Sequence, residues 1–263
     1  MEKKKIALIT GASAGIGKEF AHVHAELGGD LVIVARREDK LLALKEELQN
    51  KFEAKVNLLV KDLSDPKTPK EIYEELNREG IQIDYLINNA GFGGLGKFAE
   101  RDLAKELNMI NLNISALTSL THFFLQDAVK RNSGRILNVS STASLLPGPL
   151  QAVYYATKAF VTSFSNALAE ELHDTDISVT NLMPGATATE FGSVSGMDKT
   201  TLFDKTVSAR KVAEDGYNGM LNGKLDVISG LTVSQKIMIS MVPLTPKKVL
   251  LSQIRKMQVV KGQ

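Results

Sequence analysis

The chain has 263 residues, of which 24% are charged and 43% hydrophobic, and its formal net charge at pH 7 is +2. This near-neutral balance lacks the basic field that drives nucleic-acid binding, so we expect no nucleic-acid partner. Because the chain has no cysteine and its four histidines show no ligand spacing beside carboxylates, we predict neither disulfides nor a metal site.

Short apolar runs alternate with amphipathic stretches along the chain. Several of these runs are continuously apolar, which is typical of strands buried on both faces of a parallel sheet. We expect strands at Ile6–Thr10, Leu31–Ala35, Val56–Val60, Tyr85–Asn88, Arg135–Val139, Ser178–Met183 and Asp226–Ser229.

The stretches between these strands have helical periodicity. They cover Ile16–Leu27, Glu38–Lys51, Pro66–Glu79, Leu103–Arg131, Ala152–His173 and Ala209–Asn222. Asp65 is a good N-cap for the third of them, with Pro66 at the first helical position. The alternation predicts a single α/β domain, a doubly wound parallel sheet with helices on both faces.

The pattern changes twice near the C-terminal end. Residues 186–207 lose periodicity and are expected to form a mobile substrate loop within a catalytic domain of residues 1–230. Residues 231–263 are expected to be a helical tail of that domain, serving as a substrate lid, a subunit contact or a membrane-surface helix. No apolar run reaches the about 20 residues of a membrane span, and the first apolar run is too short for a signal peptide, so we expect a cytoplasmic protein.

A glycine-rich turn lies between the first expected strand and the first expected helix. Gly11 permits a tight turn, Gly15 lets the backbone approach a pyrophosphate, and Gly17 allows the helix to pack closely on the strand. Helix N-termini bind phosphates through free N–H groups and the helix dipole. Although G-x-x-x-G-x-G departs from the usual G-x-G-x-x-G, its strand–turn–helix context predicts a Rossmann-type dinucleotide site.

The same residues offer a rival interpretation. Residues 11–15 have the form G-x-S-x-G, the nucleophile elbow of serine hydrolases, with Ser13 as the nucleophile. An elbow needs an oxyanion loop from an earlier strand and a downstream acid and histidine. Here the turn follows the first expected strand, with no earlier strand to supply such a loop, and the late histidine, His173, lies at a helix end. We therefore expect no hydrolase activity.

The end of the second expected strand indicates the cofactor. NAD sites place an acidic residue about 20 residues beyond the glycines, to bind the ribose hydroxyls. This chain has Arg36 and Arg37 there instead. Because an arginine fork binds phosphate well, the pair predicts NADP, unless both are simply solvated residues opening a charged helix.

A tyrosine–lysine pair is the main candidate for chemistry. Tyr154 and Lys158 are four residues apart in an expected helix, so they share a face, and Ser141 lies thirteen positions before Tyr154. A cation beside a phenol lowers its pKa, and a hydroxyl can hold a carbonyl oxygen for proton transfer. Ser140 and Tyr155 are the obvious competitors, but the spacing favours Ser141 and Tyr154.

Taken together, these motifs resemble the short-chain dehydrogenase/reductase family over roughly residues 5–230. The resemblance implies the catalytic residues Asn111, Ser141, Tyr154 and Lys158, with Asn113 a weaker rival for Asn111. Ser13 and Arg36 match positions that bind the 2′-phosphate in NADP-preferring members, but Ala14 stands where many of them have a second basic residue, so the preference rests on Arg36, with help from Arg37. The implied cofactor-binding residues are Gly11, Ser13, Gly15, Ile16, Gly17, Arg36, Arg37, Asp62, Leu63, Asn89, Ala90, Tyr154, Lys158, Pro184, Gly185, Thr187 and Thr189.

The expected reaction is reversible hydride transfer between NADP(H) and a ketone, aldehyde or secondary alcohol. Tyr154 would exchange the proton on oxygen, Ser141 would hold that oxygen, and Lys158 would lower the tyrosine pKa and bind ribose hydroxyls. By resemblance, Asn111 would hold a water that links Lys158 to solvent. A catalytically silent NADP-binding interaction protein is the alternative function.

The expected substrate walls are mostly apolar, which favours an uncharged hydrophobic substrate. A hydroxysteroid or another bulky alcohol is the leading expectation, and a small acyl or sugar carbonyl the second. By resemblance, the helices ending near Arg131 and His173 would form a homodimer or homotetramer. The wall segments are residues 92–95, residues 145–150, and Phe191, Met197, Leu202 and Phe203 of the expected loop.

Overall fold

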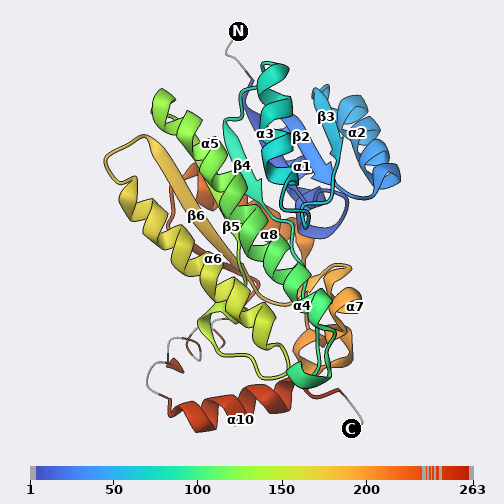
Figure 1. The fold of residues 1–263 in the computed structure, drawn as a ribbon, viewed down its shortest axis with the longest axis vertical. Coiled ribbons are helices and arrows are strands. Elements are labelled where there is room, and N and C mark those ends of the chain that lie inside the picture. The colour runs from blue at the N-terminus through green and yellow to red at the C-terminus, as the bar shows by residue number, and fades with distance from the viewer. Residues whose placement is uncertain are drawn as a thin grey trace.

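A parallel sheet of seven strands runs through the protein in the order β3-β2-β1-β4-β5-β6-β9 (Figure 1). The computed structural model describes residues 4–232, 235, 237, 239, 241–242 and 245–260. This order confirms the predicted doubly wound fold. The strands are β1 Ile6–Thr10, β2 Asp30–Ala35, β3 Val56–Val60, β4 Tyr85–Asn88, β5 Gly134–Val139, β6 Ile177–Pro184 and β9 Asp226–Ser229.

Helices cover both faces of the sheet. One face carries α1 Gly15–Glu26, α2 Glu38–Phe52 and α8 Ala209–Leu221, and the other carries α3 Thr68–Arg78, α5 Leu117–Arg131 and α6 Ala152–Glu171. Within β1, Ala7 and Ile9 belong to the first core and Leu8 to the second, and all three are 0% exposed. This burial on both faces explains why the strands are continuously apolar.

The strand order reverses between β1 and β4, which places a topological switch point at the middle of the sheet. In doubly wound sheets, ligands bind outside the carboxyl ends of the strands at this point. Buried amides fix the sheet here: Asn88 donates to Asn138 at 2.9 Å, and Asn138 donates to Ser165 of α6 at 2.9 Å. The strand ends that carry the site are therefore held rigidly to the helix beside them.

Two predicted helices differ from the observed ones. The third begins at Thr68 rather than Pro66, because Asp65 accepts a hydrogen bond from the Lys67 amide at 2.9 Å and so closes a turn ahead of the helix. The long helix over residues 103–131 is divided into α4 Leu103–Ile110, a π-helical turn Asn111–Ala116, and α5. A π turn changes which side chains share a face.

Residues 186–207, expected to form an irregular loop, contain several short elements. These are β7 Thr187–Ala188, α7 Phe191–Ser195, the 3-10 turns Met197–Lys199 and Thr201–Phe203, and β8 Val207–Ser208. The strands β7 and β8 pair with each other and bring the two ends of the segment together. Elements of two to five residues are too short to show a helical or strand period in the sequence.

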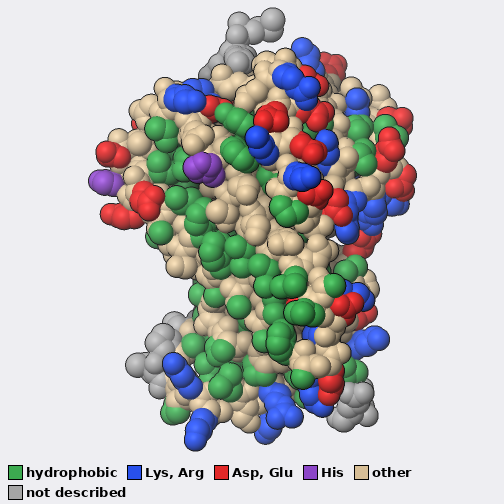
Figure 2. All heavy atoms as spheres, in the orientation of Figure 1, with side chains coloured by type: hydrophobic (Ala, Val, Ile, Leu, Met, Phe, Trp, Pro, Cys, Tyr) green, Lys and Arg blue, Asp and Glu red, His purple; other side chains and the backbone are tan. Residues whose placement is uncertain are grey.

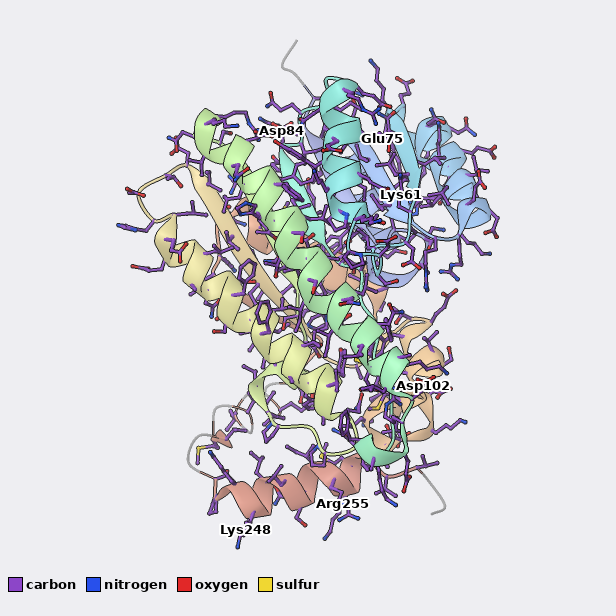
Figure 3. All side chains as sticks on the ribbon, viewed as in Figure 1. Lys61, Glu75, Asp84, Asp102, Lys248 and Arg255 are labelled. Atoms are coloured by element: carbon purple, nitrogen blue, oxygen red, sulfur yellow. The ribbon has the colours of Figure 1, made fainter. Side chains whose placement is uncertain are left out.

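A last helix, α10 Lys247–Gln258, lies across the end of the molecule where α4 and α6 begin (Figure 1). The Thr201 hydroxyl donates to the Met257 carbonyl at 3.3 Å, which joins α10 to the 186–207 segment. Figure 3 shows the basic residues Lys248 and Arg255 on the outer side of α10, both exposed. Within the described ranges, no helix is both long and apolar enough to span a bilayer.

Candidate active site

A cavity of about 880 Å³ opens at the carboxyl ends of the central strands. Its volume lies near the top of the roughly 300–1,000 Å³ range of small-molecule sites. Gly17 and Asn111 do not line it, but every other predicted cofactor-binding and catalytic residue does. These are Gly11, Ser13, Gly15, Ile16, Arg36, Arg37, Asp62, Leu63, Asn89, Ala90, Ser141, Tyr154, Lys158, Pro184, Gly185, Thr187 and Thr189.

The glycine turn forms the nucleotide end of this cavity. Gly11 and Gly15 have φ of +67° and +56°, a backbone conformation that favours glycine. A Cβ on Gly17 would collide with the Gly11 carbonyl and the Asn89 amide, which agrees with the predicted role of Gly17 in close packing. Ala14, the N-cap of α1, supplies no side-chain cap, so the first N–H groups of α1 can receive a phosphate.

The two arginines at the end of β2 have different surroundings. Arg37 donates to the Ser13 hydroxyl at 3.1 and 3.3 Å and pairs with Glu190 at 2.9 Å. The Arg36 side chain is 69% exposed and lies 3.7 Å from Asp62. Although burial opposes it, hydrogen bonds from Ser64 and the charge of Arg36 hold the pKa of Asp62 below its usual range. The structure thus places Arg37, rather than the Arg36 that the resemblance favours, beside Ser13 of the glycine turn.

The same contacts weigh against the hydrolase elbow. The Ser13 hydroxyl accepts its hydrogen bonds from a guanidinium, which cannot serve as a general base. His173 is exposed near the end of α6, where its ring bonds the Glu170 carbonyl at 2.8 Å. Ser13 thus belongs to the anion-binding turn.

Tyr154 and Lys158 lie one turn apart on α6 and are 8% and 5% exposed. The Lys158 ammonium donates to the Val139 carbonyl at 2.8 Å, and its Nζ lies 5.9 Å from the centre of the Tyr154 ring. Burial lowers the pKa of Lys158 to about 8. Burial also raises the pKa of Tyr154, and a hydrogen bond with Ser141 only partly opposes it. Desolvation is thus the main cause of both pKa shifts and disfavours the charged form of each group.

The competing residues have other partners. The Ser140 hydroxyl donates to the Lys158 carbonyl at 2.8 Å, so Ser140 packs on α6. Ser140 and Ser141 both line the cavity, but the Ser141 hydroxyl accepts from the Ala143 amide at 3.1 Å instead of donating to the backbone of α6. The Tyr155 oxygen accepts a hydrogen bond from Gln258 at 2.7 Å. The structure therefore places Ser141 and Tyr154 together, as their spacing predicts.

The two candidate asparagines have different surroundings. Asn113, which is 1% exposed, exchanges hydrogen bonds with the Phe92 backbone at 3.1 and 3.0 Å. A Cβ on Gly91 would lie 3.0 Å from its Oδ1 and 3.4 Å from the Lys158 Nζ, so the amide lies beside that lysine. Asn111 is only half-buried, and neither asparagine lines the cavity itself. The π turn that contains both residues brings Asn113, not Asn111, to this position.

Aromatic and aliphatic side chains surround the other end of the cavity. The Phe191 ring centre lies 5.4 Å from that of Tyr154 and 6.4 Å from that of Phe203. Phe92, Phe191, Met197, Leu202 and Phe203 line the cavity as predicted, whereas residues 93–95 and 145–150 do not. The polar residues at or near the cavity that the sequence interpretation missed include Gln151, Glu190 and Gln258. A glutamine among apolar residues three positions before Tyr154 was the one available signal for Gln151.

Comparison with known proteins identifies relatives of the chain. Residues 5–199 match the model of the short chain dehydrogenase family. Sulfoacetaldehyde reductase 2 from Chromohalobacter salexigens is 37% identical over 188 residues, 71% of this chain and 74% of that protein. The NADP-dependent 3-hydroxy acid dehydrogenase of Schizosaccharomyces pombe is 36% identical over 192 residues, 72% of this chain and 74% of that protein.

Solved structures agree with these matches. A short-chain dehydrogenase from Sphingobium yanoikuyae in complex with NADPH superposes with a TM-score of 0.82 at 31% identity, covering 98% of this chain and 99% of the other. A bulky-bulky ketone specific alcohol dehydrogenase from Comamonas testosteroni gives a TM-score of 0.78 at 28% identity, covering 98% and 97%. Together with the Ser141, Tyr154 and Lys158 cluster, these matches show that the chain belongs to the short-chain dehydrogenase/reductase family of oxidoreductases.

Proposed function

We propose that the protein catalyses reversible NADP(H)-dependent hydride transfer between a bulky, mainly apolar secondary alcohol and the corresponding ketone. One observation carries the proposal: Ser141, Tyr154 and Lys158 share a single cavity with a phosphate-binding turn that holds Ser13 and Arg37. Proton-transfer groups and an anion site in one cavity fit the transfer of a hydride and a proton to the two ends of a carbonyl.

The nucleotide end fits NADP. The uncapped start of α1 would hold the pyrophosphate, and Arg37 and Ser13 would hold the 2′-phosphate, with Arg36 adding charge. When bound, the cofactor supplies or accepts the hydride. The NADPH complex of the Sphingobium structure and the NADP-dependent yeast relative support this choice over NAD.

The protein residues would handle the proton and the oxygen. Because the pKa of Tyr154 is raised, its phenol keeps its proton at neutral pH and can donate it to a carbonyl oxygen that Ser141 holds in place. With a pKa of about 8, Lys158 is largely charged at pH 7 and would stabilise the phenolate formed by this transfer. Asn113, rather than Asn111, would order the polar path beside Lys158.

The apolar end of the cavity supports the proposal that the substrate is bulky and mainly apolar. Phe191 and Phe203 stack with their planes 17° apart, and with Phe92 and Met197 they form a wall suited to an alicyclic ring system. The specificity of the Comamonas enzyme for bulky ketones agrees with this choice. The substrate specificities of the Comamonas enzyme and of the two curated relatives are properties of those proteins.

We also propose that the protein forms a homodimer or homotetramer. Figure 2 shows hydrophobic side chains gathered across the middle of the face that α5 and α6 form. Exposed apolar residues on the helices include Leu103 and Leu107 on α4, Val129 on α5 and Phe160 on α6. Such a surface is typical of a protein–protein contact. A cytoplasmic location stays a prediction.

Replacing Tyr154 with phenylalanine tests the proposal most directly. With a panel of alicyclic ketones, and NADPH oxidation followed by absorbance, we expect kcat to fall by about 10²–10⁴-fold because the proton donor is lost. NADPH affinity, measured by fluorescence titration, should change little. Wild-type turnover by Tyr154→Phe would refute the assignment, and tight NADPH binding without any turnover by the wild type would identify a silent cofactor-binding protein.

A further inference from the structure

The charge of the chain is unevenly distributed along the sequence. Residues 227–263 contain six lysines and arginines and no aspartate or glutamate, although the whole chain has a formal net charge of only +2. The other residues therefore carry a net negative charge. An excess of one sign gathered in one segment indicates a partner of the opposite charge, even where the total charge is small.

Four of these basic residues belong to α10, the helix that lies across the end of the molecule. They are Lys247, Lys248, Arg255 and Lys256. All four are exposed, and none of them pairs with a carboxylate among the residues that the structure describes. Figure 3 shows Lys248 and Arg255 pointing away from the protein, and Figure 2 shows Lys and Arg side chains along the same end. Their charges are therefore available to a partner.

Exposed apolar side chains lie among these charges. Val249, Leu251 and Met257 of α10 are 48%, 37% and 43% exposed. Leu251 is three residues after Lys248 and four before Arg255, so on a helix it lies beside both. The outer side of α10 thus combines cationic and apolar groups, which is typical of a helix that lies in the interface of an anionic bilayer.

The inner side of α10 is fixed to the rest of the protein. Ile254 and Gln258 are 6% and 0% exposed. The Gln258 Nε2 donates to the Tyr155 hydroxyl at 2.7 Å, and the Thr201 hydroxyl donates to the Met257 carbonyl at 3.3 Å. Figure 1 shows α10 lying crosswise to the longest axis of the molecule, at one end of it. A helix held in this way presents its whole outer side to a flat surface.

We propose that α10 docks the protein on an anionic lipid bilayer, with its basic residues at the lipid phosphates and its exposed apolar residues among the headgroups. A second copy of the chain fits poorly, because a two-fold contact between α10 helices would place like charges opposite each other. A nucleic acid would pair with the cations but not with the apolar side chains, and α10 has no aromatic residue for base stacking. A bilayer accommodates both kinds of group.

Docking through α10 also brings the substrate end of the cavity close to the lipid. Thr201, which bonds α10, directly precedes Leu202 and Phe203 of the cavity wall. A bulky apolar ketone or alcohol concentrates in a bilayer, so the docked protein would meet its substrate there. This consequence rests on the proposed function, whereas the docking itself does not.

Vesicle sedimentation with the full chain tests the docking. We expect binding to vesicles of phosphatidylcholine with about 30% phosphatidylglycerol, and binding at least about tenfold weaker to pure phosphatidylcholine. Raising the NaCl concentration from about 0.05 to 0.5 M should weaken the binding to anionic vesicles, because salt screens the charges. No binding to these vesicles at low salt, or equal binding to both kinds, would overturn the proposal.

A triple variant removes charge from the outer side of α10. Lys248→Gln, Arg255→Gln and Lys256→Gln together should lower the affinity for anionic vesicles by at least about tenfold. The matched control makes the same replacement at three exposed lysines elsewhere and should stay within about threefold of the wild type. Its positions are Lys40, Lys67 and Lys224. With thermal unfolding showing that both proteins are folded, equal losses in the two would refute the role of α10.

A second variant distinguishes lipid from other anionic partners, and it retains every charge. Val249→Thr with Met257→Gln should weaken binding to anionic vesicles by about tenfold, because less apolar surface enters the interface. Binding to heparin, RNA and polyglutamate should not change. Wild-type vesicle binding by this variant, or tighter wild-type binding to one of these polymers than to vesicles, would refute membrane docking. NADPH oxidation with the ketone panel needs no vesicles, so docking and the proposed function can fail separately.

Discussion

The nucleotide end and the substrate end of the cavity are constructed in different ways. At the nucleotide end, adjacent strand ends, two glycines with positive φ and a helix N-terminus create the binding groups from backbone. At the substrate end, the walls come from the short elements of residues 186–207, from the start of α6 and, through Gln258, from α10. The backbone groups of the glycine turn are local in the sequence, whereas the Tyr155–Gln258 hydrogen bond near the substrate end joins residues 103 positions apart.

This difference determines how each end can vary. A backbone site depends on a few glycines and strand ends, so it tolerates little change. A site made of side chains on short elements can change its walls without disturbing the sheet. Substitutions at the catalytic and nucleotide groups should therefore change activity equally for all substrates. Substitutions at the substrate end should change activity for some substrates more than for others.

The largest effect in this comparison is expected from Asn113→Ala. Loss of its amide removes the hydrogen bonds to the Phe92 backbone and the polar neighbour of Lys158, so we expect kcat to fall by about 100-fold, equally for every ketone. Asn111→Ala is the matched control on the same π turn and should keep kcat within about twofold of the wild type. Steady-state kinetics with saturating NADPH measure both, and a larger loss in Asn111→Ala would restore the original assignment.

The asparagine pair also shows what could not be predicted from the sequence. The order of strands and helices, the glycine turn, and the spacing of Ser141, Tyr154 and Lys158 follow from periodicity and local motifs, and the structure brings the three side chains into one cavity. The choice between Asn111 and Asn113 assumed a regular α-helix. A π turn has no clear sequence signature, so the face that each residue occupies could not be derived from a 3.6-residue period.

The polar groups near the substrate end were missed for a different reason. Gln151 and Gln258 acquire their significance only from tertiary contacts, since one borders the cavity and the other reaches Tyr155 from α10. Neither lies at a motif spacing. Glu190 is similar, because its ion pair with Arg37 forms only when the 186–207 segment packs against the nucleotide end.

A smaller but more selective effect is expected at the arginines. Arg37→Gln removes the guanidinium beside Ser13, so we expect NADPH affinity to fall by about 10- to 100-fold while NADH affinity stays nearly constant. Arg36→Gln should weaken NADPH binding by only about threefold, because the Arg36 side chain is largely exposed. Fluorescence titration with both dinucleotides measures these changes. Equal losses for NADPH and NADH in Arg37→Gln would contradict a 2′-phosphate site.

The smallest expected effect is a difference in pH dependence between the two reaction directions. Reduction uses the protonated phenol of Tyr154, whose pKa is raised, so its rate should stay flat from pH 6 and decline only as Lys158, with a pKa of about 8, loses its charge. Oxidation requires the phenol to lose its proton first, so its rate should increase with pH through the same range. Profiles of kcat/KM in both directions, with one alcohol–ketone pair, test this prediction. Because the overall reaction releases a proton, the ratio of the two profiles changes with pH whichever group is the donor, so the shape of each profile is compared between the wild type and Tyr154→Phe. The same plateau and decline in Tyr154→Phe would mean that Tyr154 does not carry the transferred proton, and the catalytic centre would then have to be assigned again while the nucleotide end kept its assignment.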